Sequence, residues 1–120
     1  MQSDKGMHLH LHGIRNCDSC RRAVKWLHSN NVPHTLHDFR EEGLSRDLVD
    51  DWLASSHGPM LLNRRSTTWR QLSTAQKQAA ERDPASLIMD HPTLLKRPVI
   101  TDGENIVAVG FEPTKLEHCI

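Results

Sequence analysis

Hydrophobic and polar positions alternate at the start of the chain, where apolar residues and one glycine in the segment 7–13 are separated by single histidines. This period of two predicts a β-strand over residues 8–13. From Ser19 or Cys20 the apolar spacing becomes helical, and the predicted helix ends near residues 30–31. Residues 34–39 predict a second strand. The length of the helical connection favours a parallel pair of strands.

The middle of the chain is predicted to be mostly helical. Its apolar residues recur at helical spacing, and small polar residues or proline stand where helices commonly begin. A loop or short turn is expected over residues 61–65. The first of these helices is expected to begin at Ser45 and to end at residues 57–59. Later helices are expected to begin at Thr67 or Thr68, at Ser73 or Thr74, and at Pro84.

The last part of the chain returns to strand patterns. Residues 98–101 and 106–109 are apolar and rich in β-branched side chains, and Asp102-Gly103 lies between them. An Asp-Gly pair supplies the positive φ of a tight turn, so a β-hairpin is predicted. A short helix should follow over residues 113–117. The element order is therefore β-α-β, several helices, then β-β-α.

Composition narrows the class of protein. The 120 residues suffice for one domain, and 15 basic residues balance 15 acidic ones. This balance argues against broad electrostatic binding to nucleic acid or to a membrane surface. No apolar run approaches the roughly 20 residues that span a bilayer. We expect a cytoplasmic, monomeric protein with reduced thiols and no bound metal or cofactor.

Candidate chemistry lies at Cys17 and Cys20, which form a Cys-x-x-Cys pair directly after the first strand. Cys17 would stand at a helix N-terminus, where free N–H groups and nearby arginines favour a thiolate. Cys20, one turn later, could attack a mixed disulfide on Cys17 and release the partner. The alternative is a pair of ordinary buried thiols. A zinc site would need two further ligands at suitable spacing.

Four ordered stretches resemble the ArsC/Spx/YffB family of thioredoxin-fold proteins, and most closely its YffB-like members. Each stretch carries a motif of that family, and together they extend over about residues 7–116. They are Gly13-Ile14-Arg15-Asn16-Cys17-Asp18 with Arg21-Arg22, then His37-Asp38-Phe39-Arg40, then the segment 61–70, and Pro92-Thr93-Leu94-Leu95-Lys96-Arg97-Pro98-Val99-Ile100.

The resemblance implies a thioredoxin-like (glutaredoxin-like) α/β fold, with a four-stranded mixed sheet and a helical insertion. On this basis the chain is one domain, with a core of about residues 7–43 and 92–117 and an insertion of about 44–91. The resemblance also implies that Cys17 is the nucleophile and that the Arg97–Pro98 bond is cis. Arg97 with Arg64 or Arg65 would bind the anionic group.

The same resemblance offers three functions. Arsenate reductases of the family use glutathione and glutaredoxin. They typically carry a further arginine near the end of the last strand, whereas residues 109–112 of this chain include no basic side chain. They also usually lack a thiol at the position of Cys20. Both departures favour a general thiol reductase that uses glutathione as co-substrate. A Spx-like redox regulator that binds RNA polymerase stays open as an alternative.

Several further residues carry expectations of their own. Asn16 precedes the nucleophile, so we expect it to contact the turn or a ligand. Arg40 is expected to be structural, and Trp26, Trp52 and Trp69 are expected to pack in the interior. His8, His10 and His12 share one strand face without an evident partner ligand, so metal binding is not favoured there. Cys119 is expected to be an exposed thiol.

Overall fold

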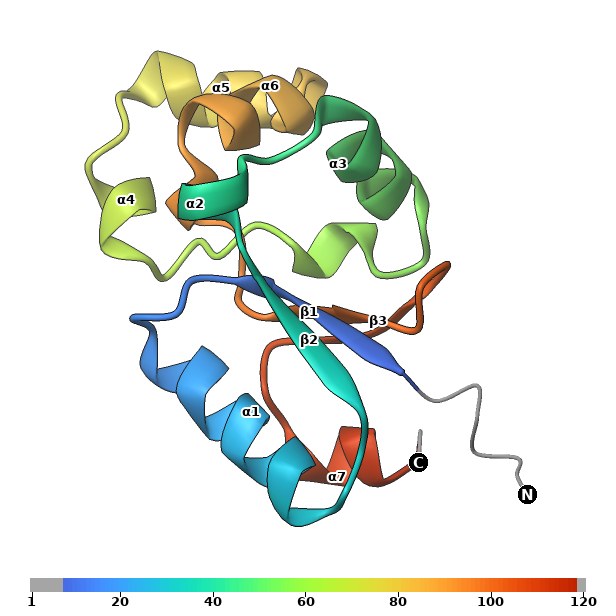
Figure 1. Cartoon of the computed structure of the whole chain (residues 1–120). Helices are drawn as coiled ribbons and strands as arrows, with labels where there is room; N and C mark the ends of the chain where they lie inside the picture. Colours follow the sequence, from blue (N-terminus) through green and yellow to red (C-terminus); the bar gives the residue numbers. More distant parts are fainter. Residues whose placement is uncertain (1–7, 119–120) are drawn as a thin grey trace. The chain divides into compact units, whose positions relative to one another are not determined.

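The structure is a computed structural model and describes residues 8–118. The chain divides into two compact units, one made of residues 1–43 and 97–120 and the other of residues 44–96 (Figure 1). The first unit contains the sheet and the Cys-x-x-Cys pair. Its elements are β1 (Leu9–Gly13), α1 (Asp18–Ser29), β2 (His34–Asp38), α2 (Phe39–Glu42), β3 (Val99–Thr101), β4 (Ile106–Val109) and α7 (Pro113–Glu117).

The sheet has four strands in the order β2-β1-β3-β4. β1 pairs in parallel with β2, whereas β3 runs antiparallel to both β1 and β4. The predicted mixed α/β sheet is therefore confirmed. The parallel pairing of β1 and β2, which α1 connects, and the hairpin of β3 and β4 are confirmed as well.

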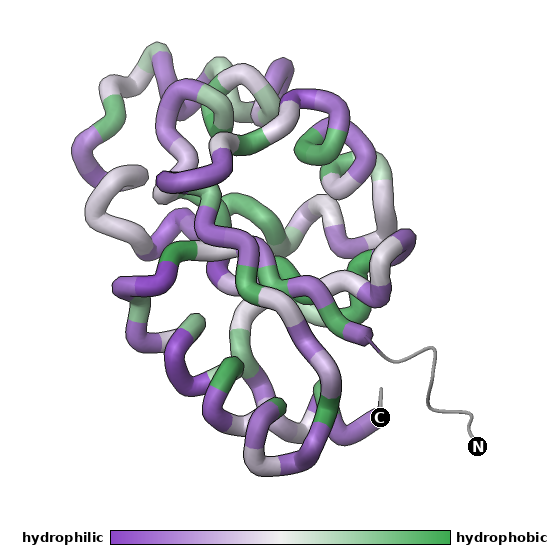
Figure 2. The backbone as a smooth tube through the Cα atoms, viewed as in Figure 1, coloured by the Kyte–Doolittle hydropathy of each residue, from purple (hydrophilic) through white to green (hydrophobic). Residues whose placement is uncertain are grey.

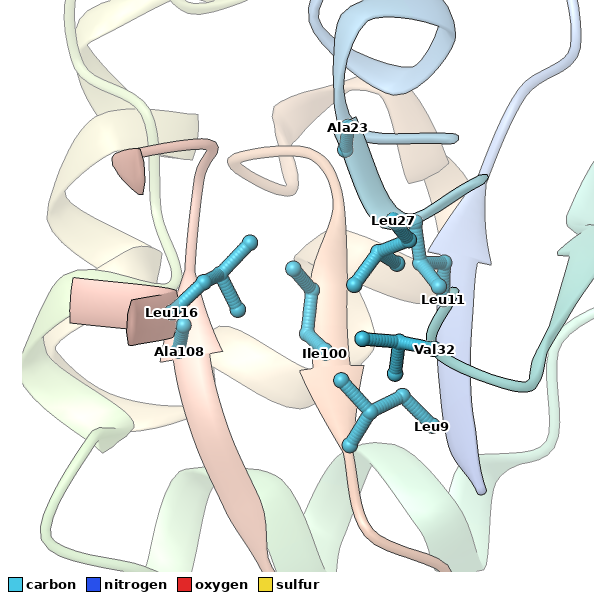
Figure 3. Close-up of a cluster of buried hydrophobic side chains, with 8 residues drawn as sticks. All are labelled: Leu9, Leu11, Ala23, Leu27, Val32, Ile100, Ala108 and Leu116. Atoms are coloured by element: carbon cyan, nitrogen blue, oxygen red, sulfur yellow. The ribbon is translucent and has the colours of Figure 1, made fainter. Parts of the chain in front are cut away.

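The core of this unit lies on the sheet face that α1 and α7 cover. Leu9, Leu11 and Ile100 from the strands meet Leu27 of α1 and Leu116 of α7, and all five side chains have no exposed surface (Figure 3). The tube of α1 alternates between hydrophilic and hydrophobic stretches, as expected for a helix with one buried face (Figure 2). Burial of each such side chain contributes roughly 1.5–3 kcal/mol.

The chain leaves β2 one residue earlier than the apolar pattern predicts. Phe39 is buried, but it is the first residue of α2 and not the last residue of a strand. The cause is Asp38, whose carboxylate accepts a hydrogen bond from the Arg40 N–H at 2.8 Å and caps the helix. The prediction of a strand through Phe39 is wrong for this reason.

The hairpin turn forms as its Asp-Gly pair predicts. Gly103 has a φ of +106°, and the Asp102 N–H donates to the Asn105 carbonyl oxygen at 3.0 Å. The Asp102 carboxylate also accepts the N–H groups of Glu104 and Asn105. One side chain and one glycine therefore close the turn.

The second unit is helical, and polar caps start most of its helices. Ser73 and Gln76 form a reciprocal capping box at the start of α5, and Ser45, Ser66 and Asp83 cap the starts of α3, α4 and α6. The 3-10 turn at Pro92–Leu94 is absent from the predicted elements. The elements of this unit are α3 (Arg46–Ala54), η2 (Gly58–Met60), α4 (Thr67–Arg70), α5 (Thr74–Arg82), α6 (Pro84–Asp90) and η3 (Pro92–Leu94).

The tryptophans pack as predicted. Trp26 packs against the core of the first unit, and Trp69 packs against the buried cluster of Leu72, Ala80, Leu87 and Leu94 in the second. Trp52 is 4% exposed. Within the part of the chain that the structure describes, no helix has both the length and the apolar character needed to cross a membrane.

Candidate functional site

Cys17 stands at the N-cap of α1, immediately after the turn that leaves β1. Its backbone is extended, with φ −136° and ψ 127°, and its carbonyl oxygen accepts the N–H of Arg21 at 2.9 Å. α1 therefore begins at Asp18, one residue before the predicted start. This position presents the Cys17 sulfur to the free N–H groups of the first helical turn.

The surroundings of Cys17 favour its thiolate. Partial burial acts to raise the pKa of the thiol. The opposing effects outweigh burial, so the pKa of Cys17 lies below its ordinary value. These effects come from the N–H and side-chain thiol of Cys20, the positive charge of Arg97 and the N–H of Ser19. Cys17 thus has the features of an activated nucleophile.

Cys20 behaves in the opposite way. It has no exposed surface, and burial together with the neighbouring Cys17 sulfur raises the pKa of its thiol to about 11. Cys20 therefore keeps its proton and donates it in a hydrogen bond to the Cys17 sulfur. Both cysteines are free thiols in this structure. Cys119 lies outside the described residues.

Gly13 provides the space that Cys20 occupies. A Cβ atom at position 13 would lie 2.5 Å from the Cys20 sulfur and 3.8 Å from the Pro98 Cα atom. A distance this short would force the buried thiol to move. Glycine at the end of β1 therefore allows the Cys20 sulfur to occupy its present position.

Arg97 and Pro98 lie beside the two thiols. The Arg97–Pro98 bond is cis, as the resemblance implies, and Pro98 is buried with its carbonyl oxygen accepting the Gly110 N–H at 2.9 Å. Arg97 lowers the pKa of both cysteines through its charge. Its Nη1 atom is buried and has no hydrogen-bond partner among residues 8–118. Unpartnered buried donors are costly, so this atom is suited to an incoming anion.

The turn before Cys17 is held from β2. The Asp38 carboxylate, in a side chain only 4% exposed, accepts the Arg15 N–H at 2.9 Å. This bond and those from the Arg40 and Glu41 N–H groups keep the pKa of Asp38 below its usual range. Arg40 therefore acts structurally through its backbone N–H, which donates to the Asp38 carboxylate.

Asn16 lies in the same turn and is exposed. Its side-chain oxygen accepts a hydrogen bond from Arg21 Nη1 at 3.0 Å, so the residue links the turn to the first turns of α1. A direct contact of Asn16 with a ligand stays a prediction.

Arg64 and Arg65 belong to the second compact unit. The Arg64 guanidinium lies over the Trp69 ring, 5.3 Å from its centroid. The Arg65 N–H donates to Asn63 Oδ1, and its carbonyl oxygen accepts from Arg70 Nη2. The structure thus brings together Cys17, Cys20, Arg97 and Pro98, while the role of Arg64 and Arg65 at the thiol stays a prediction.

The histidines of β1 share one face of the sheet with His37 of β2. His10 Nδ1 and His37 Nε2 lie 3.0 Å apart, and the His12 and His37 rings stack at 4.8 Å. Across residues 8–118, no group of three or more His, Cys, Asp or Glu side chains is arranged to hold a metal ion. His8, which directly precedes β1, lies 2.8 Å from Thr35 Oγ1 through its Nε2 atom, and His37 Nδ1 lies 3.1 Å from Glu42 Oε1.

Gly13 and Asp38 stand in the family motifs, but the sequence alone assigns neither residue a role in the site. Gly13 has no chemistry of its own, and Asp38 lies 23 residues along the chain from Arg15, the partner it holds. A signal existed for each: a glycine closing a strand just before a cysteine, and an aspartate closing the parallel partner strand. Neither signal identifies its partner without the fold.

Comparison with known proteins identifies relatives of three kinds. An uncharacterised protein of Haemophilus influenzae is 39% identical over 103 residues, covering 84% of this chain and 89% of its own. The global transcriptional regulator Spx of Staphylococcus aureus is 29% identical over 105 residues, which cover 86% of this chain and 79% of the Spx chain. A solved structure of a protein named YffB has a TM-score of 0.84 and 33% identity, covering 92% and 96%.

A second solved structure, an arsenate reductase (ArsC) related protein from Brucella melitensis, has a TM-score of 0.72 and 34% identity, covering 93% of each chain. The family model described as "ArsC family" matches residues 12–119, which contain the Cys-x-x-Cys pair and the Arg97–Pro98 bond. The resemblance inferred from the sequence motifs is therefore confirmed, and this chain belongs to the ArsC family.

Proposed function

We propose that this protein is a thiol-dependent reductase in which Cys17 is the nucleophile and glutathione is the reducing co-substrate. The observation that supports it most is the pairing of a thiol of lowered pKa with a buried, unpartnered guanidinium nitrogen on Arg97. The first favours the thiolate form of the nucleophile. The second offers a hydrogen-bond donor to the negative group of a substrate or co-substrate.

The reaction follows thiol–disulfide exchange. The Cys17 thiolate attacks one sulfur of a disulfide, a new S–S bond forms, and the other sulfur leaves as a thiolate. A glutathione thiolate then attacks the Cys17 sulfur of this mixed disulfide, so that the second substrate sulfur leaves as a thiolate and a Cys17–glutathione disulfide forms. A second glutathione thiolate attacks the glutathione sulfur of that disulfide, which releases oxidised glutathione and restores the Cys17 thiolate. The substrate disulfide gains two electrons, and two glutathione molecules become one oxidised glutathione.

Cys20 is better suited to support the thiolate than to resolve the mixed disulfide. Burial raises the pKa of its thiol to about 11, so Cys20 keeps its proton while Cys17 carries the thiolate. The side chain also has no exposed surface. This supports glutathione, a thiol from outside, as the resolving species. The cytosol, where glutathione is abundant and reduced, is the compartment that fits.

The test is turnover of bis(2-hydroxyethyl) disulfide with glutathione, coupled to NADPH through glutathione reductase. We expect Cys17→Ser to abolish turnover, while Cys119→Ser, the matched change at the last cysteine, leaves it unchanged. Full turnover by the Cys17→Ser protein would refute the proposal. Cys20→Ser should retain most of the activity if glutathione resolves the intermediate.

Arsenate is an alternative substrate, and the relatedness to an arsenate reductase (ArsC) related protein supports testing it. The segment 109–112 contributes no basic side chain, which leaves fewer donors for an oxyanion. Arsenate-dependent NADPH consumption with glutathione and glutaredoxin present would favour this substrate. Its absence alongside disulfide turnover would favour the general reductase.

A redox-sensing regulator is the second candidate function. It is supported by 29% identity to the global transcriptional regulator Spx and by the Cys17–Cys20 pair. This reading predicts that the protein binds the α subunit of RNA polymerase and that oxidation changes the binding. A pull-down without association under reducing or oxidising conditions would exclude it.

A further inference from the structure

A groove in the first unit lies between α1 and β2, beside the turn that carries Cys17. It has a volume of about 400 Å³. The residues that line it come from the turn, from one face of α1 and from the middle of β2. They are Arg15, Arg21, Val24, Lys25, His28 and Leu36.

The lining is apolar at its floor and basic at its rim. Val24 and Leu36 are only partly buried and pack against the core from its outer side. Arg15, Arg21 and Lys25 carry positive charge, and none of the described residues that line the groove is acidic. A ligand that fits these surfaces carries an apolar side chain with negative charges on both sides of it.

The rim cations are available to an incoming anion. Arg15 pairs with Glu41 at 3.2 Å, but both side chains are more than half exposed, and such a pair contributes little free energy. The Arg21 guanidinium donates to the neutral side-chain oxygen of Asn16 and makes no ion pair with another described residue. Among the described residues Lys25 makes no ion pair. The groove therefore has positive charge that residues 8–118 leave largely without an acidic partner.

β2 adds a way to hold an extended chain. It is one of the two outer strands of the sheet, so one side of its backbone N–H and C=O groups has no strand partner among residues 8–118 (Figure 1). Outer strands of this kind can pair with a segment from another chain. Backbone pairing would supply affinity, while the floor and the rim would select the sequence.

We propose that this groove is a docking site for an extended, acidic segment of a partner protein, with one apolar side chain of the segment resting on Val24 and Leu36. The inference goes beyond the proposed reductase function and does not depend on it, because binding needs no reactive thiol. Arg21 lies one helical turn from Cys17, since its N–H donates to the Cys17 carbonyl oxygen. A docked protein is therefore held next to the thiol.

The test uses the fluorescein-labelled peptide Glu-Asp-Glu-Leu-Glu-Asp-Glu and the full chain carrying Cys17→Ser, so that no covalent attachment contributes. Fluorescence anisotropy should show saturable binding that weakens as salt is raised. Lys25→Glu should weaken binding roughly fivefold. Arg82→Glu reverses an exposed charge outside the groove and should change binding by less than about twofold. A peptide with serine in place of leucine should bind about tenfold more weakly.

Location is tested separately from affinity. Addition of the peptide should shift the backbone amide resonances of Val24 and Leu36 in a heteronuclear NMR spectrum. Three results would overturn the proposal. They are resonance shifts confined to other residues, an equal loss of peptide affinity in the Lys25→Glu and Arg82→Glu proteins, and the absence of saturable binding. Tighter binding of a short oligothymidylate at the same residues would also overturn it, because the groove would then be a nucleic-acid site.

Discussion

The carboxylate of Asp38 accepts a hydrogen bond from the backbone N–H of Arg15 across 2.9 Å, and this bond ties the end of β2 to the turn that carries Cys17. The same carboxylate caps α2 through the Arg40 N–H. One buried side chain thus determines both where β2 ends and how the chain approaches the nucleophile. The position of Cys17 therefore depends on a residue of the neighbouring strand.

Replacement of Asp38 by asparagine should slow the reaction of Cys17 without unfolding the protein. The amide keeps one acceptor oxygen but cannot serve all the N–H groups that the carboxylate accepts, so the turn loses its fixed geometry. We expect the rate of Cys17 alkylation at pH 7 to fall roughly two- to tenfold. Iodoacetamide kinetics with Cys20→Ser and Cys119→Ser also in place would measure it. An unchanged rate in a folded protein would contradict the role of Asp38.

Removal of the Arg97 charge should raise the pKa of Cys17, because that charge is one of the causes that lower it. In an Arg97→Met protein the pH profile of alkylation should move to higher pH, and the rate at pH 7 should fall about threefold or more. Arg82→Met, outside the site, is the matched control and should leave the profile in place. A profile that moves equally in both proteins would rule out a specific effect of Arg97.

Substitution of alanine for Gly13 should strain the packing around Cys20. The new Cβ atom would lie 2.5 Å from the Cys20 sulfur. Overpacking of this kind costs about 1–3 kcal/mol of unfolding free energy. A double-mutant cycle with Cys20→Ala, read by urea denaturation, isolates the contact. The alanine at position 13 should cost little once the sulfur is absent, and an undiminished cost would place the strain elsewhere.

Stability should fall as the pH drops from about 6.5 to about 4. Burial and the neighbouring charges of His37 and His10 lower the pKa of His12 from 6.5 to about 4. Between these values the unfolded chain binds a proton at His12 that the folded protein does not, so acid favours unfolding. The full shift would correspond to about 3 kcal/mol, and because His12 is partly exposed, screening by solvent should reduce the loss to about 1–2 kcal/mol.

Urea denaturation at pH 7 and at pH 4.5 measures this loss, and the His12→Gln protein is the comparison. The pKa of His10 is lowered in the same direction, so part of the acid sensitivity should remain in that variant. A pH dependence identical in the two proteins would show that His12 does not carry the effect.

The amino-acid sequence by itself determined the element order and the location of the thiol. Alternation around Leu9 and Leu11, helical spacing after Cys17 and the Asp102-Gly103 pair are local patterns. Local patterns predict secondary structure because strand and helix geometry repeat over a few residues. The Cys-x-x-Cys spacing at a strand–helix junction likewise predicts a thiolate without any knowledge of the rest of the fold.

Only the tertiary structure decided which residues support that thiol. Three features depend on residues that are not neighbours in the chain. They are the hydrogen bond from the Arg15 N–H to Asp38, the packing of Cys20 against Gly13 and the burial of Arg97 Nη1. The end of β2 differs from these contacts, because it is set by a local cap: the Asp38 carboxylate accepts the Arg40 N–H and ends the strand while Phe39 is still buried. Burial and pairing are properties of the assembled sheet and helices, and no periodicity within one segment encodes them.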